Sequence, residues 1–427
     1  MCRDLIVRIK GPQSFRGRVR APGSKAYTHR ALLASLLSQG ETIIQGASEC
    51  DDAHRTLEAI QFLGARVQIQ NSRIVSYGTG RLASNTAPID CGESGATLRF
   101  LTAIAGTSPT RTTLVAGHRL AKRPLEPLLK AMETLGASTT IAENGEGCEV
   151  KVHGPLKGGE TWIRGDVSSQ FISGLLFAAP LAASDVTIHL NGRLESRPYV
   201  EMSLHVLKRH GISIDVGDND FHIPAPQKYT AAFHDVPGDF SSSAFLIAGG
   251  GLAGEEITVS GLNPGSGEPD AVFLKVVDQM GLEVRNVGQT LEVRGSKLEP
   301  FEFDAMDNPD LVPPLEVLGC FAKGISEIRG VRRLRYKETN RLQTIPAELG
   351  KMGAKIRVNG DIVKIRGGGL VGCELDSKRD HRVAMSCAIA SIGATGDSSI
   401  HNAEAVSKSY PEFFQDLSTL GVDLNVE

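Results

Sequence analysis

A helix-ending glycine recurs six times along this chain at nearly constant spacing. At each of these places an amphipathic helical pattern runs into Gly, and an extended apolar stretch follows. The intervals between successive glycines are 72, 75, 70, 72 and 68 residues. A single Gly of this kind is a common helix C-cap, but this series indicates a repeated structural unit of about 70 residues. The glycines are Gly64, Gly136, Gly211, Gly281, Gly353 and Gly421.

The order of patterns within one repeat predicts its secondary structure. A small or polar signature opens the repeat, and a helix follows that is apolar on nearly all sides, as in Phe171–Phe177. Such a helix is expected to be buried. A short strand, a polar turn, the amphipathic helix, the glycine and further strand follow. The pattern predicts an α/β protein built from six βαβαββ repeats.

Two similar segments divide the repeats into halves. Ala21-Pro22-Gly23-Ser24 resembles Val236-Pro237-Gly238-Asp239, and the two lie 215 residues apart, which is about three repeats. We interpret them as two crossings between domains of three repeats each. Residues 22–237 would form one domain with repeats one to three. Residues 1–21 and 238–427 would form the other, in which the N-terminal strands (5–9 and 15–19) pack with repeats four to six.

Composition excludes several classes of protein. The 427 residues are 41% hydrophobic and carry a formal net charge of −3, so there is no general basic field for nucleic acid. No apolar run approaches the length of a membrane span, and no signal-peptide pattern opens the chain. The seven cysteines form no CxxC or metal-ligand spacing and suit reduced thiols in a cytosol. We therefore expect a cytoplasmic protein without a metal.

Polar residues gather at two places in the repeat, the start of the apolar helix and the start of the amphipathic helix. Cations oppose the dipole at a helix N-terminus, so Lys and Arg collected there indicate a strongly anionic ligand. At the first place stand Lys25, Arg30, Arg99, Ser168, Ser169, Gln170, Asp310, His381 and Arg382. At the second stand Arg119, Arg123, Ser196, Arg197, Tyr199, Lys337, Glu338, Arg341 and Lys408.

Each of these motifs taken alone also has a purely structural interpretation. Ser168-Ser169 could cap a helix, Asp310 could begin a turn, and residues 337–341 could be an exposed helix face with a Glu–Arg pair. Their recurrence at equivalent places favours a ligand site. The GxGxxG match at residues 249–254 follows a helix and precedes a strand, the reverse of a dinucleotide fold, and we reject it. No HExxH or GxSxG motif supports metal or acyl-transfer chemistry.

The motifs together resemble the 5-enolpyruvylshikimate-3-phosphate synthase family, in family order and over essentially the whole chain. The resemblance implies a two-domain inside-out α/β barrel of six βαβαββ repeats, working as a monomer without a cofactor. It also implies transfer of the enolpyruvyl group of phosphoenolpyruvate to the 5-hydroxyl of shikimate 3-phosphate, with release of phosphate. The segments that carry it are 22–25 with Arg30, 92–99, 122–124, 168–170, 196–199, 309–310, 337–341, 380–382 and 408–411.

Site residues follow from the same resemblance. Asp310 is expected as the base, Glu338 as the acid at carbon and Lys25 as a bridge that stabilises charge, although the base could also be Lys25. We expect Lys337, Glu338 and Arg341 to share one helical turn. Shikimate 3-phosphate would contact Lys25, Arg30, Ser168, Ser169, Gln170, Ser196, Tyr199, Asp310 and Lys337. Phosphoenolpyruvate would contact Lys25, Gly95, Arg123, Gln170, Glu338, Arg341, Arg382 and Lys408.

Three positions depart from the family pattern, and two other functions compete. Ala26 stands where the family usually has Ser, Ala96 where it commonly has Thr, and Arg333 where an Asn is common. These bear on affinity and inhibitor sensitivity. UDP-N-acetylglucosamine enolpyruvyl transferase would carry a loop Cys that residues 115–124 lack. A non-catalytic anion-binding protein would not need both Asp310 and Glu338.

Overall fold

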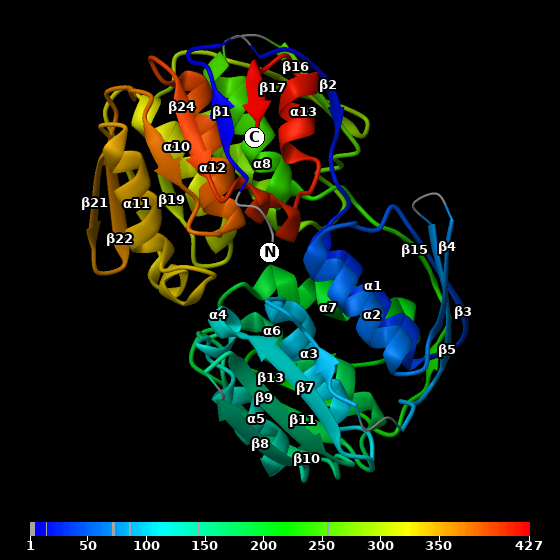
Figure 1. Ribbon diagram of the computed structural model, residues 1–427. Coiled ribbons are helices and arrows are strands. Elements are labelled where there is room, and N and C mark those ends of the chain that lie inside the picture. The colour runs from blue at the N-terminus through cyan, green and yellow to red at the C-terminus, as the bar shows by residue number, and fades with distance from the viewer. Residues whose placement is uncertain (1–4, 14, 71–72, 85–86, 144, 254–255) are drawn as a thin grey trace. The chain divides into compact units, whose positions relative to one another are not determined.

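The computed structural model describes residues 5–13, 15–70, 73–84, 87–143, 145–253 and 256–427 (Figure 1). The chain divides into two compact units. Unit 1 comprises Met1–Pro22 and Pro237–Glu427, and unit 2 comprises Gly23–Val236. Among the described residues, none of the helices has both the length and the apolar composition that crossing a membrane requires.

Each repeat contains one helix that is buried almost all round, as predicted. In unit 1 these interior helices contact one another pairwise. Leu, Ile, Val, Phe and Ala side chains dominate them, and the Lys, Arg and Glu residues they contain lie in their first two turns, at the end that carries the candidate site residues. The interior helices are α1 (Lys25–Leu37), α3 (Gly95–Ala105), α6 (Ser169–Ala178), α8 (Phe240–Ala253), α10 (Val312–Phe321) and α12 (His381–Gly393).

The second helix of each repeat is amphipathic and ends before one of the six recurrent glycines. All six glycines have positive φ angles, from +79° at Gly211 to +107° at Gly64, so the prediction that they terminate helices is confirmed. The helices are α2 (Asp51–Phe62), α5 (Glu126–Thr134), α7 (Arg197–Arg209), α9 (Phe273–Gln279), α11 (Arg341–Lys351) and α13 (Phe413–Thr419). The strands that follow are β4 (Arg66–Gln70), β8 (Ser138–Glu143), β12 (Asp215–Val216), β17 (Glu283–Val287), β21 (Lys355–Asn359) and β25 (Leu424–Val426).

A small sheet closes each repeat on the outside. In most repeats an edge strand pairs in parallel with a central strand, which pairs in turn with an antiparallel hairpin. One face of each central strand is buried, as the alternation in β11 shows. The central strands are β3 (Ser38–Gln45), β7 (Thr112–Gly117), β11 (Val186–Asn191), β16 (Glu256–Ser260), β20 (Ile325–Arg329) and β24 (Ser398–His401). Helices inside and sheets outside confirm the predicted inside-out α/β fold.

Five strand pairings show why the chain crosses twice. The edge strand beside β16 is β2 (Gly17–Arg20), which comes from the N-terminus. The edge strands beside β3 are β14 (Tyr229–Thr230) and β15 (Phe233–Asp235), which come from the end of the third repeat. The other N-terminal strand, β1 (Val7–Ile9), lies between β24 and β25. Both N-terminal strands therefore pair with strands from the second half of the chain.

The three remaining repeats have edge strands from their own sequence. These are β6 (Ile89–Asp90), β10 (Gly159–Arg164) and β19 (Glu302–Asp304), and the last repeat uses β23 (Glu374–Asp376) in the same way. The first hairpin partners are β5 (Arg73–Thr79), β9 (Gly147–His153), β13 (Asp220–Ile223), β18 (Thr290–Arg294) and β22 (Ile362–Arg366).

The rejected dinucleotide motif lies within the interior helix α8. A Cβ atom on Gly250 would approach Ile257 of β16 to 2.8 Å, and one on Gly251 would approach Leu282 to 2.5 Å. These glycines therefore let the helix pack closely on its own sheet. Gly254 lies outside the described residues.

A buried carboxyl in α10 predicts an unusual dependence of stability on pH. Glu316 is 1% exposed, and the described residues give its carboxyl oxygens no hydrogen-bond partner. Burial raises its pKa from 4.5 to about 8. The folded protein therefore holds a proton that the unfolded chain releases, so stability is lost as pH rises from about 4.5 to about 8.

We expect Glu316→Met to remove this loss without adding a buried polar group. The gain in unfolding free energy should be small near pH 4.5 and grow to several kcal/mol at pH 8.5, at about 1.4 kcal/mol per pKa unit. Urea unfolding of both proteins across this range measures it. A gain that did not change with pH would contradict the buried-acid interpretation.

Candidate active site

In unit 2, Lys25 opens the interior helix α1 and pairs with an acidic residue. Ser24 caps the helix by accepting a hydrogen bond from the Tyr27 backbone N–H at 3.1 Å. The Lys25 Nζ atom lies 2.9 Å from the Oδ2 atom of Asp52, in the first turn of α2. Sequence analysis did not select Asp52, because an acid in a first helical turn is ordinary dipole compensation.

Arg30 is the buried cation of α1. It is 3% exposed, and its guanidinium lies 5.2 Å from the centre of the Phe100 ring. It donates hydrogen bonds to Ser203 Oγ at 2.7 Å and to the Tyr199 carbonyl at 2.9 Å, both in α7. The predicted residue Ser196 caps α7 from a left-handed conformation (φ 55°) and is buried. The contacts of Arg30 thus connect the predicted residues of α1 and α7.

A second group in unit 2 joins the N-termini of α3 and α6. Arg99 donates to the side-chain oxygen of Gln170 at 2.8 Å and to Ser168 Oγ at 3.4 Å. Ser168 is the N-cap of α6, where it accepts a hydrogen bond from the Gln170 backbone N–H. Ser169 begins the helix and is buried. Three predicted residues therefore lie together, and Arg99 orients two of them.

Gly95 permits a guanidinium to lie against the N-terminus of α3. A Cβ atom at Gly95 would lie 3.0 Å from the Arg123 Nη1 atom, so a side chain there would displace the arginine. The first N–H groups of a helix beside a guanidinium form a natural anion site. The structure therefore brings Gly95 and Arg123 together, as a binding site for a phosphate or carboxylate group requires.

In unit 1, Asp310 lies among three cations. Its carboxyl Oδ1 atom is 3.0 Å from Lys337 Nζ, 3.0 Å from Arg341 Nη1 and 3.4 Å from Arg382 Nε. Burial alone would raise the pKa of Asp310, but these cations outweigh it and hold the pKa well below 3.8. Burial lowers the pKa of Lys337 to about 8, although Asp310 opposes this.

Arg341 is the centre of this group. Its side chain is 1% exposed and forms two hydrogen bonds with Asp380, at 2.9 and 3.0 Å. It also donates to Glu338 Oε2 at 2.6 Å. Asp380, the N-cap of α12, additionally accepts from Thr339 Oγ1 and the Arg382 backbone N–H. Asp380 belongs to the 380–382 segment that carries the family resemblance, but no site role was predicted for it.

The local structure of residues 337–340 differs from the prediction. Lys337, Glu338 and Arg341 do not share a helical turn, because α11 begins only at Arg341. Lys337 follows a 3₁₀ helix (η4, Arg332–Tyr336), and a bend connects the two helices. Glu338 contacts Arg341 from this bend. The two side chains therefore lie together as predicted, although no helix connects them.

The charge argument made from sequence also needs correction in unit 1. Lys337, Arg341 and Arg382 are matched there by the carboxylates of Asp310, Glu338 and Asp380. These cations therefore need no anionic ligand to offset their repulsion. In unit 2, Arg30 and Arg99 donate to hydroxyl, amide and carbonyl oxygens.

The remaining positions of interest are more dispersed. Lys408 ends a 3₁₀ helix (η5, Ala403–Lys408) that contacts α12. Arg333 is buried and donates to the Met306 carbonyl at 2.5 Å. Ala26 has a backbone carbonyl that accepts a hydrogen bond from Arg30 at 2.7 Å, and Ala96 lies in the first turn of α3.

In the described part of the chain, one group of acidic and histidine side chains lies close enough together to hold a metal ion. The ligand atoms of Glu338, Asp380 and His381 lie within 4.8 Å of one another. The Nη2 group of Arg341 already binds both carboxylates. A metal ion there would face a guanidinium group, so the geometry favours an ion-pair network.

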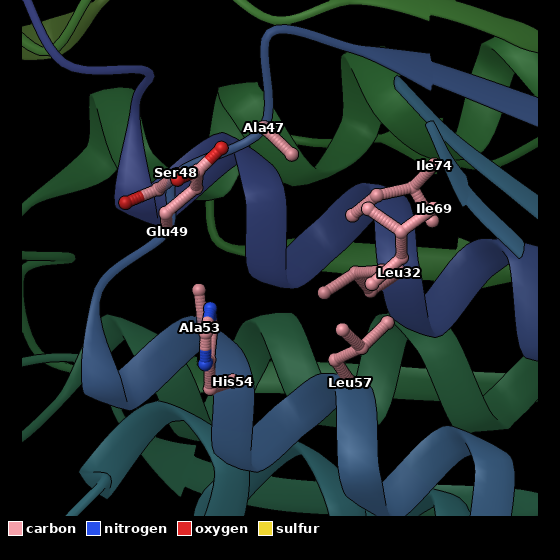
Figure 2. A pocket seen from close by; sticks show the side chains of 9 residues that line it. All are labelled: Leu32, Ala47, Ser48, Glu49, Ala53, His54, Leu57, Ile69 and Ile74. Carbon is pink, nitrogen blue, oxygen red and sulfur yellow. The ribbon is translucent and has the colours of Figure 1, made fainter. Parts of the chain in front are cut away.

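A separate cavity is lined by residues outside the predicted set. It occupies about 240 Å³ between α1, α2 and the hairpin β4–β5 (Figure 2). It is apolar over most of its wall and polar at one end, so it lacks the charge needed for anionic substrates. The lining residues include Leu32, Leu57, Ile69 and Ile74, with Ser48, Glu49 and His54 as the polar ones.

Comparison of the sequence with known proteins identifies a family. A sequence model of EPSP synthase (3-phosphoshikimate 1-carboxyvinyltransferase) matches residues 9–417. The 3-phosphoshikimate 1-carboxyvinyltransferase of Methanosarcina acetivorans is 40% identical over 419 residues, covering 96% of this chain and 97% of that protein. The enzyme of the same name from Halobacterium salinarum strain R1 is 36% identical, covering 96% of this chain and 98% of its own.

Solved structures show the same fold. An EPSP synthase from Acinetobacter baumannii has a TM-score of 0.83 at 24% identity and covers all of both chains. The enolpyruvyl transferase NikO from Streptomyces tendae has a TM-score of 0.80 at 19% identity, covering 99% of each. At such identities these structures bear on the fold alone, whereas the sequence matches bear on the family. The chain belongs to the EPSP synthase (3-phosphoshikimate 1-carboxyvinyltransferase) family.

Proposed function

We propose that the protein transfers the enolpyruvyl group of phosphoenolpyruvate to the 5-hydroxyl of shikimate 3-phosphate and releases phosphate. The observation that carries the proposal is the pair of carboxyls, Asp310 and Glu338, that contact the same buried Arg341. Addition followed by elimination needs one group to take the hydroxyl proton and another to protonate the methylene carbon. A binding protein of this fold would need neither.

Asp310 is the base in this proposal and Glu338 the acid. The low pKa of Asp310 keeps it ionised and able to accept a proton, and the cations around it stabilise charge that develops on the substrates. Lys25 bridges the reacting groups, held by Asp52. Lys25 is the alternative base.

The binding roles divide between two sets of residues. Shikimate 3-phosphate is held by Lys25, Arg30, Ser168, Ser169, Gln170, Ser196, Tyr199, Asp310 and Lys337. Phosphoenolpyruvate is held by Lys25, Gly95, Arg123, Gln170, Glu338, Arg341, Arg382 and Lys408. The guanidinium of Arg123 against the N-terminus of α3 supports a subsite for phosphoenolpyruvate there.

The proposal takes the active protein to be a monomer. The free thiols of the described cysteines fit a reducing compartment such as the cytoplasm. Light scattering at the protein concentration of the activity assay measures the molar mass and so tests whether the protein is monomeric.

Initial rates of phosphate release test the reaction. Phosphoenolpyruvate is supplied with shikimate 3-phosphate or with UDP-N-acetylglucosamine as the acceptor. We expect release with the first acceptor only. Release with only the nucleotide sugar would assign the protein to the other enolpyruvyl transfer, and release with neither would leave an anion-binding protein.

Removing one arginine at a time should weaken the two substrates separately. Arg123→Ala should mainly weaken phosphoenolpyruvate and Arg30→Ala mainly shikimate 3-phosphate. Each loss should be about 2–5 kcal/mol, typical of a buried charge pair that loses one partner. Calorimetric titration of both ligands measures the losses. Equal losses for both ligands in both variants would contradict the division.

A further inference from the structure

A buried carboxylate outside the predicted site contacts two of its elements. Asp270 is 0% exposed and lies in a 3₁₀ helix (η2, Pro269–Val272) that precedes α9. Its Oδ1 atom accepts a hydrogen bond from Asn308 Nδ2 at 2.9 Å, and it also accepts one from the Ser241 hydroxyl. Neither the motif pattern nor any role given above includes Asp270.

The contact with Ser241 leads to a substrate-binding arginine. Arg382 donates from Nη2 to the Ser241 Oγ atom at 2.5 Å and from Nη1 to the Ser241 carbonyl at 3.4 Å. A hydroxyl that donates to Asp270 must turn its lone pairs toward its other neighbour. Asp270 thereby makes Ser241 an acceptor for Arg382 and restricts where that guanidinium lies.

The contact with Asn308 leads to the proposed base. The Asn308 side-chain amide donates to Asp270 and, at 2.9 Å, to the Pro269 carbonyl. Asn308 is followed by the short 3₁₀ helix η3 (Pro309–Leu311) that contains Asp310. The Asp310 carbonyl in turn accepts from Arg382 Nη1 at 3.0 Å. Asp270 is thus connected to both Arg382 and Asp310.

We propose that Asp270 is a positioning residue, which holds Arg382 through Ser241 and the Asp310 segment through Asn308 for the binding and reaction of phosphoenolpyruvate. The proposal rests on the proposed function. The electrostatics agree with it, since burial and the neighbouring Asp310 raise the pKa of Asp270 while Asn308, Ser241 and Arg382 favour its ionised form. Any buried carboxylate needs hydrogen-bond donors, and here both donors belong to segments that contact Arg382 or contain Asp310.

The test compares Asp270→Asn, Ser241→Ala and the double variant with wild type. An Asn at this position presents an amide donor where Asn308 and Ser241 require acceptors. We expect Asp270→Asn to lower kcat/KM for phosphoenolpyruvate by about tenfold to a hundredfold, since small misplacements of a reacting group cost this much. The KM for shikimate 3-phosphate should change less, because Asp310 is one of nine residues proposed to hold that substrate. Asp278→Asn, an exposed change in the same segment, is the matched control and should have no effect.

The double variant separates positioning from general destabilisation. If Asp270 acts through Ser241, the double variant should be no worse than Asp270→Asn alone, because both changes interrupt one chain of contacts. Multiplied losses, equal losses for both substrates, or wild-type kinetics in Asp270→Asn would each overturn the proposal. If Asp270→Asn fails to fold, Ser241→Ala decides, and wild-type kinetics there would overturn it. Inactive wild-type protein would instead refute the proposed function.

Discussion

Glu338→Gln is expected to lower turnover by about 10²–10⁴-fold, the usual contribution of one acid–base group. The amide keeps the shape of the side chain and can still accept from Arg341, which contacts Glu338 at 2.6 Å. It cannot deliver a proton to the methylene carbon of phosphoenolpyruvate. Binding of shikimate 3-phosphate should stay near normal, because Glu338 has no role in holding it.

Exchange of the methylene hydrogens with solvent deuterium gives a second readout of the same step. This exchange should fall together with turnover in Glu338→Gln. Glu283→Gln, an exposed change on β17, is the control and should alter neither quantity. Near-wild-type turnover of the Gln variant would make Glu338 a structural partner of Arg341, with the acid elsewhere.

Arg341→Met should destabilise the protein by about 3–5 kcal/mol, the cost of removing one partner from a buried ion network. Arg341 is 1% exposed and contacts Asp310, Glu338 and Asp380. Its loss leaves three carboxylates close together, and of these Asp310 keeps Lys337 and Arg382 as ion-pair partners. Methionine fills most of the volume, so the effect reports on charge more than on packing.

Denaturant unfolding at neutral pH measures this loss. Part of the stability should return as the pH is lowered, because protonation of the stranded carboxyls removes their repulsion. Arg357→Met, at an exposed position on β21, is the control. A loss below about 1 kcal/mol, the range of exposed ion pairs, would show that the network contributes little to folding.

The repeat architecture could be predicted because it follows from local rules that recur. Gly64 and its five equivalents are required wherever a helix ends in the left-handed conformation, and an apolar helix must be buried whatever surrounds it. The segments that supply the edge strands of the first and fourth repeats were harder to predict from the sequence. Strand β2 pairs with β16 across more than half of the sequence, and no local pattern encodes a partner at that distance.

The sequence predicted which residues belong to the site better than it predicted which residues they contact. Motif positions selected Lys25, Asp310 and Arg341, but the partners Asp52 and Asp380 resemble ordinary helix-capping residues in sequence. Asp270 stands in no motif and becomes visible only through Asn308 and Ser241. The helix expected at 337–340 is absent. A bend places Glu338 beside Arg341 just as a helical turn would, so the closeness of the two residues did not require a helix.

The central claim is that one chain joins an enolpyruvyl group to shikimate 3-phosphate. Phosphorus and proton NMR of a single reaction mixture test it most directly. We expect phosphoenolpyruvate to disappear in step with the appearance of inorganic phosphate. A product should form in equal amount that keeps its phosphate ester and shows a new pair of vinyl protons. Loss of phosphoenolpyruvate to pyruvate and phosphate, with shikimate 3-phosphate unchanged, would contradict the account.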